Sequence, residues 1–227
     1  MTNWVETIRR AQASIIATVI LIAITVALGV AILSYILSYT GTSSYRATIE
    51  KAVAQVAGDT LFYLESYNSS SYIVVSSGGK TVKVPAYCWY LGLRTITGLP
   101  RAYELIIATP DLRVVLDSTS SYVVVRWLPP EGSSWVNPPA VSVPASKLYL
   151  KSLVGAYVEL SAINPGVSYY APWTINYTGT GVPGLIETCI SSSFVNNLNT
   201  TLQAILVYGV AGGTWYYEVA RVPLQRS

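Results

Sequence analysis

Residues 15–37 read IIATVILIAITVALGVAILSYIL and form an almost continuous apolar run. Fourteen of its 23 residues are Ile, Leu or Val, and no charged residue occurs from Ala11 to Tyr45. As a helix the stretch is about 34 Å long, and the hydrocarbon core of a bilayer is about 30 Å thick. The sequence therefore predicts a helix that inserts into a membrane.

The flanking charges predict how this helix is oriented. Arg9 and Arg10 precede it, and the next basic residue is Arg46. The positive-inside rule then keeps the N-terminus in the cytoplasm and places the rest of the chain outside. The apolar run is too long for a cleaved secretory signal and too apolar for a twin-arginine signal. An uncleaved anchor and a cut before the helix both remain open.

Residues 9–14 read RRAQAS and lead directly into the apolar helix. This arrangement resembles the type III signal of archaeal type IV pilins and archaellins, and the resemblance covers about residues 1–45. It implies that a prepilin peptidase cuts between Ala11 and Gln12 and leaves the helix on the mature subunit. Ile16 occupies the fifth mature position, where bacterial pilins usually carry a glutamate.

The expected organisation has three parts. Residues 1–11 form a leader peptide, and residues 12–67 form one helix, with 12–40 as the membrane or filament core. Residues 41–67 continue it as an amphipathic helix, because apolar residues recur there at spacings of three and four. Small residues permit close helix packing, and the expected helix-packing residues are Ala23, Ala27, Ala31 and Ile16.

From residue 72 onward the pattern changes to that of strands. Runs rich in Val, Ile, Leu and Tyr are separated by turn residues, and 72–75 with 81–84 reads as a hairpin. Further expected strands lie in 103–107, 112–116, 121–127, 148–161, 202–208 and 214–222. The expected fold class is α+β: a long N-terminal hydrophobic helix followed by a single antiparallel β-sandwich domain over 72–227, extracellular, in the manner of a pilin.

Two covalent features are expected in this outer part. Because this part is expected to lie in an oxidising exterior, Cys88 and Cys189 are predicted to form a disulfide. The alternative is two buried free thiols, since sequence separation says nothing about proximity. Three Asn-x-Ser/Thr sequons predict N-glycosylation at Asn68, Asn176 and Asn199.

Composition excludes several classes of function. Charged residues are 11% of the chain, the net charge is +3, and no basic run is present, so nucleic-acid binding is disfavoured. Histidine is absent, and no catalytic residue, metal ligand or cofactor is expected. Residues 179–184 match a dinucleotide-binding pattern by letter, but Pro183 and the absence of a helical run afterwards indicate a loop. The chain has eighteen tyrosines, whose rings can be buried while their hydroxyls stay in water, and this suits a surface that packs against neighbouring subunits. The alternatives are a tyrosine-rich sheet face without a partner and a surface on which sugars stack.

The resemblance predicts the function. It implies a non-enzymatic structural subunit of an archaeal type IV pilus, inserted in the membrane before assembly and then part of an extracellular filament for adhesion or cell contact. Its partners would be other copies of the chain, the prepilin peptidase and the pilus assembly machinery. The alternatives are an archaellum subunit and an uncleaved, membrane-anchored extracytoplasmic binding domain.

Overall fold

The computed structural model describes residues 2–77, 80–179 and 181–226, without the side chains of residues 2–19, 37–44, 76–77 and 80. The chain divides into two units, Met1–Glu50 and Lys51–Ser227. Each unit is described by itself.

The first element is a single helix, α1, Thr2–Asp59. Its sequence is rich in Ala and Ile and contains no proline, so no residue within it removes a backbone hydrogen-bond donor. In the second unit, Val53 and Val56 of the last turns are buried, whereas Lys51 and Gln55 are exposed. This end of the helix is therefore amphipathic, as the spacing predicts.

The helix ends at Asp59 and not near residue 67 as expected. Residues 60–67 instead pair with residues 89–95, from Thr60 opposite Thr95 to Tyr67 opposite Trp89. In residues 60–67, apolar residues spaced three and four apart predict a helix, but pairing with the distant residues 89–95 makes them a strand instead.

The side chain of Asp59 anchors the end of α1. Its carboxylate accepts hydrogen bonds from the backbone N–H and the hydroxyl of Thr97 and from the guanidinium of Arg101, at 2.7–2.8 Å. Desolvation by burial raises the pKa of Asp59, but these hydrogen bonds outweigh it and hold the pKa below its ordinary value. The helix end is therefore fixed to the connection that follows the second strand.

After α1 the chain is mainly extended. The remaining elements are β1 Thr60–Ser77, β2 Lys80–Thr95, β3 Arg101–Ala108, β4 Val115–Leu116, β5 Val123–Leu128, β6 Val143–Pro144, η1 Ala145–Lys147, β7 Leu148–Lys151, β8 Tyr157–Glu159, α2 Leu160–Ile163, β9 Tyr169–Tyr170, β10 Trp173–Tyr177, β11 Gly184–Ser191, α3 Ser192–Asn196, β12 Gln203–Val210 and β13 Trp215–Pro223.

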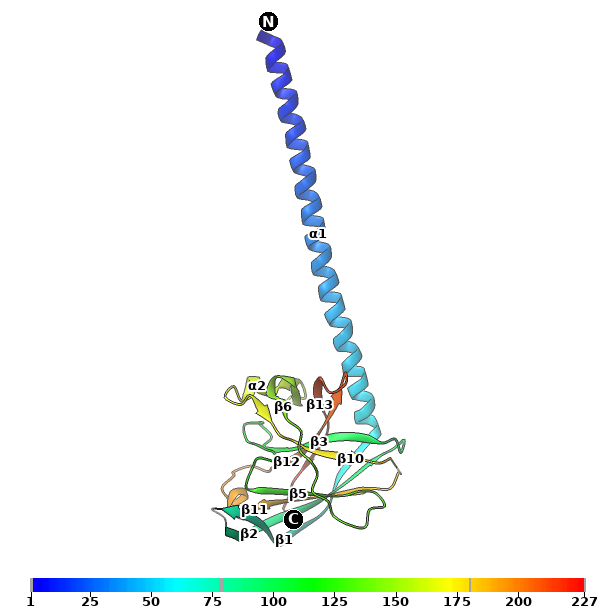
Figure 1. Cartoon of the computed structure of the whole chain (residues 1–227), viewed down its shortest axis with the longest axis vertical. Helices are drawn as coiled ribbons and strands as arrows, with labels where there is room; N and C mark the ends of the chain where they lie inside the picture. The colour runs from blue at the N-terminus through cyan, green and yellow to red at the C-terminus, as the bar shows by residue number, and fades with distance from the viewer. Residues whose placement is uncertain (1, 78–79, 180, 227) are drawn as a thin grey trace. The chain divides into compact units, whose positions relative to one another are not determined.

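These strands form three sheets in the described part of the chain. The first has the order β1-β2-β11-β5, and the second has the order β10-β3-β12-β13-β7-β8 with β4 beside β3. The third is the pair β6-β9. In the view of Figure 1 the first sheet lies below β3, β10 and β12 of the second.

The second sheet curls over part of its own core. One buried cluster joins Ile106 of β3, Ile205 of β12 and Leu148 of β7, although β7 lies several strands from β3 in the sheet. Val143 of β6 and Leu160 of α2 belong to the same cluster. The curled sheet and these short elements thus enclose one core.

The expected fold class is wrong. The chain is mostly β, with several sheets in place of a single antiparallel sandwich, and β13 pairs with β7 in parallel. Over the residues whose side chains are described, no helix is both long and apolar enough to cross a membrane. The sequence pattern locates strands but does not reveal which of them pair, so the curled sheet and its parallel pair could not be read from it.

Candidate functional site

The first unit has an unusual surface over residues 20–36. No charged residue lies in this part of α1, and its large apolar side chains are 49–72% exposed. They are Ile20, Leu21, Ile22, Ile24, Val26, Leu28, Val30, Ile32, Leu33, Tyr35 and Ile36. We call residues 20–36 the apolar segment. Soluble monomers rarely expose such a continuous apolar surface, so the apolar segment is a candidate interaction site.

The expected helix-packing alanines belong to this segment. Ala23, Ala27 and Ala31 are exposed and recur every fourth residue of α1, and therefore share one side of it. Ile16 lies outside the residues whose side chains are described, as do Ala11 and Gln12 at the expected cleavage position.

The second unit contains the predicted disulfide. Cys88 of β2 and Cys189 of β11 are directly opposite each other in the sheet, with Cα atoms 4.0 Å apart, and they are bonded. The sequence prediction for this pair is confirmed. The bond closes a loop with a sequence separation of 101 residues and joins two neighbouring strands that are distant in the chain.

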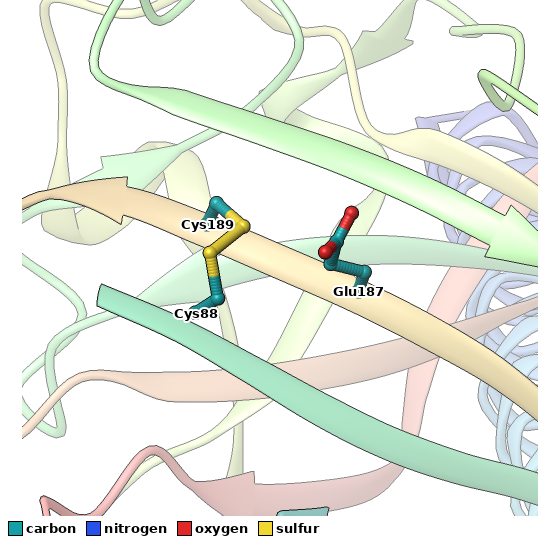
Figure 2. Close-up of side chains that lie close together, drawn as sticks. All are labelled: Cys88, Glu187 and Cys189. Carbon is teal, nitrogen blue, oxygen red and sulfur yellow. A yellow bond between two sulfur atoms is a disulfide. The ribbon is translucent and has the colours of Figure 1, made fainter. Parts of the chain in front are cut away.

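Glu187 lies beside this disulfide. It precedes Cys189 by two residues on β11 and therefore projects from the same face, as Figure 2 shows. The two sulfur atoms and a carboxylate oxygen of Glu187 lie within 4.8 Å of one another. While the sulfurs are bonded to each other they are not thiolates, so the bonded form offers a metal only the carboxylate.

Two further side chains hold the carboxylate of Glu187. Tyr90 donates a hydrogen bond to Oε1 at 3.0 Å, and Nη1 of Arg126 lies 3.4 Å from Oε2. Burial raises the pKa of Tyr90, and the hydrogen bond to Glu187 raises it further, so the phenol stays protonated as a donor. Glu187 is thus a mostly buried carboxylate with a fixed orientation.

A cavity of about 240 Å³ opens next to this cluster. Arg126, Glu187 and Cys189 line it together with Asn137, Tyr72 and apolar residues of β1. The cluster is therefore reachable by a small ion or molecule.

The three sequon asparagines are all exposed. Asn68 lies in an irregular part of β1, where its side-chain oxygen accepts a hydrogen bond from the backbone N–H of Ser70 at 2.9 Å. Asn176 lies within β10, an edge strand, and Asn199 lies in the turn after α3 beside a cavity of about 420 Å³. Exposure is compatible with glycosylation at each position, and occupancy stays a prediction.

Sequence reasoning missed Glu187 because it did not expect β11, and it missed Tyr90 and Arg126 because they lie opposite Glu187 only through strand pairing. Residues 185–190 read LIETCI, which does not alternate between apolar and polar residues, so the sequence carried no clear strand signal there. It also missed Glu104, whose burial raises its pKa to about 7, partly offset by a hydrogen bond from Thr174 at 2.8 Å.

No family model, curated protein sequence or solved structure matches this chain.

Proposed function

We propose that the chain is a non-enzymatic structural subunit that polymerises through the N-terminal part of α1 into an extracellular filament of the archaeal type IV pilus kind. The observation that carries this proposal is the apolar segment, an uncharged length of helix whose large side chains are exposed. The resemblance of residues 9–14 to a type III signal supports the same function. It implies removal of residues 1–11 by a prepilin peptidase before an assembly machinery adds the subunit to the filament.

The physical basis is burial of apolar surface. Each square ångström of apolar surface removed from water contributes about 25 cal/mol, and eleven large side chains of the segment are exposed. The same segment of other copies is a suitable cover, because it has the same apolar character and small residues that permit close approach. Ala23, Ala27 and Ala31 are the positions at which neighbouring helices would come closest.

The test compares valines in the two units. Val26→Asp with Val30→Asp places two carboxylates in the apolar segment, where each valine is 59% exposed. Val154→Asp is the matched control, because this valine is 89% exposed in a turn of the second unit. The chain and its variants are produced with a prepilin peptidase and an archaeal pilus assembly system, and surface material is imaged by electron microscopy.

Filaments from the wild type and from Val154→Asp, but none from the double variant, are the expected result, since a carboxylate buried without a partner is strongly unfavourable. Mass spectrometry of the filament subunit is expected to give Gln12 as its first residue. A correctly trimmed protein that stays monomeric in detergent, with no filaments, would contradict the proposal and favour an anchored binding domain.

A further inference from the structure

The cluster of Cys88, Glu187 and Cys189 has a second possible state. In the bonded state the two sulfurs hold β2 to β11, and the carboxylate of Glu187 lies beside them. If the bond is reduced, two thiols and one carboxylate occupy the same small volume. These are ligand types that zinc and related divalent ions prefer.

We propose that the reduced form of this cluster binds one thiophilic divalent metal ion through both thiolates and the carboxylate of Glu187. The metal then replaces the disulfide as the link between β2 and β11. This inference is independent of the proposed filament function.

The geometry of the ligand atoms supports the proposal. With bonds of about 2.3 Å to sulfur and 2.0–2.2 Å to oxygen, ligand atoms around a tetrahedral zinc ion are about 3.5 Å apart. The three atoms already lie within 4.8 Å of one another, and the Cα atoms of the cysteines are only 4.0 Å apart. After reduction the thiols stay close, since the strands that carry them are paired over residues 86–93 and 184–191.

The surrounding charges favour a bound metal over three bare anions. Two thiolates, one carboxylate and a divalent cation have a net charge of −1, and the guanidinium of Arg126, 3.4 Å from Glu187, balances it. Tyr90 donates to Oε1 of Glu187 at 3.0 Å and so orients the ligand in the way that outer-shell donors do in metal sites.

The site also has an entry path. The cavity of about 240 Å³ beside Glu187 and Cys189 admits an ion and leaves room for a water molecule as a fourth ligand. Ile73 and Ala86 are buried in one cluster with the two cysteines, and this apolar surrounding strengthens the attraction between metal and thiolates.

The reduction step balances with a trialkylphosphine as reductant. The phosphine supplies two electrons, the S–S bond breaks, and water provides the oxygen of the phosphine oxide and the two protons of the thiols. Metal binding then releases both thiol protons to solvent.

The experiment uses the full chain, reduced by a phosphine under anaerobic conditions and titrated with Co²⁺ as a spectroscopic probe. The expected result is one Co²⁺ per chain with sulfur-to-metal charge-transfer absorption, absent from the disulfide form. Glu187→Gln is expected to weaken Co²⁺ binding at least tenfold. Glu65→Gln, an exposed carboxylate on β1, is the matched control and is expected to bind like the wild type.

A second measurement shows whether the chain unfolds when the disulfide is reduced. Circular dichroism reports strand content, and Zn²⁺ is expected to raise the melting temperature of the reduced chain but not of Cys88→Ser with Cys189→Ser. Two titratable thiols and intact strands without any cobalt absorption would overturn the proposal. Loss of strands that Zn²⁺ fails to restore would also overturn it, as would equal binding by Glu187→Gln and Glu65→Gln.

Discussion

Ile32 in the first unit and Ile106 in the second are the same residue in opposite environments. Ile32 is 58% exposed on α1, whereas Ile106 of β3 is fully buried in a cluster with residues of β12 and β7. The second unit encloses a core of buried apolar side chains, whereas in the first unit Ile49 is the only buried residue among those whose side chains are described. Sheet pairing and a disulfide therefore hold the second unit together, whereas the apolar segment has its large side chains exposed, and the proposed filament would cover them with other copies of the chain.

Removal of the disulfide is the largest expected effect on stability within this comparison. Cys88→Ala with Cys189→Ala opens a loop with a separation of 101 residues. Loop-closure entropy predicts a loss of about 4.7 kcal/mol for a loop of this length. Urea unfolding in a mild detergent measures this loss of unfolding free energy. Tryptophan fluorescence reports the transition, because five of the six tryptophans lie in the second unit. An unchanged midpoint would show that the second unit does not depend on this link.

The matched isoleucines test the comparison directly. Ile106→Ala leaves a cavity in a closed core and is expected to cost about 2–5 kcal/mol of unfolding free energy. Ile32→Ala is expected to change the unfolding free energy of the dispersed monomer by less than about 0.5 kcal/mol, since it removes no intramolecular packing. The same urea measurement serves for both, and similar losses from the two variants would contradict the division.

The pH dependence of stability tests a further difference between the two units. The second unit has a core in which the carboxyl group of Glu104 is buried. Its pKa is raised to about 7 in the folded chain, so the folded state holds a proton that the unfolded state has already lost. Wild-type stability is therefore expected to fall as pH rises from about 4.5 to about 7 and then to level off. Glu104→Gln is expected to remove this slope, on the order of 2 kcal/mol between pH 5 and pH 8.

The control for the pH measurement is Glu131→Gln, which changes an exposed carboxyl in a turn. It is expected to keep the wild-type slope. If Glu104→Gln and the wild type show the same pH dependence, the carboxyl is not held in its protonated form.

The smallest expected effect belongs to the first unit. Arg46 and Glu50 form an ion pair at 3.0 Å on α1, with both side chains largely exposed. Solvent screens such a pair, so Arg46→Ala is expected to change the unfolding free energy by less than about 0.5 kcal/mol. Thermal melts of the wild type and Arg46→Ala at low and high salt measure this change. A large, salt-dependent loss of stability in the variant would contradict the prediction and show that Arg46 makes stronger interactions than this exposed pair.

Local sequence signals predicted several elements well. The hairpin over 72–84 is present as the far end of β1 and β2, with Val75 opposite Val82. The expected strands 103–107, 202–208 and 214–222 correspond to β3, β12 and β13 within two residues. Each of these runs is apolar or alternates between apolar and polar residues, and the structure forms a strand there, so the local pattern was sufficient to predict it.

Other parts depended on contacts between distant residues and could not be predicted. The stretch 148–161 is divided into β7, β8 and the start of α2, because Ser152 and Gly155 form a turn within it. β10 and β11 were not expected, yet β11 lies between β2 and β5 and carries both Glu187 and Cys189. The candidate metal cluster was invisible for this reason: its members come together only through strand pairing.

The bond between Cys88 and Cys189 has a mechanical consequence for a chain pulled by its ends. Tension passes from β2 to β11 through the sulfur atoms, so the residues between the two cysteines bear no load. That shielded loop contains β3, β5, β7 and β10, and only the flanking segments are able to lengthen. A stretched molecule would therefore stop extending well short of its contour length while the covalent bridge holds.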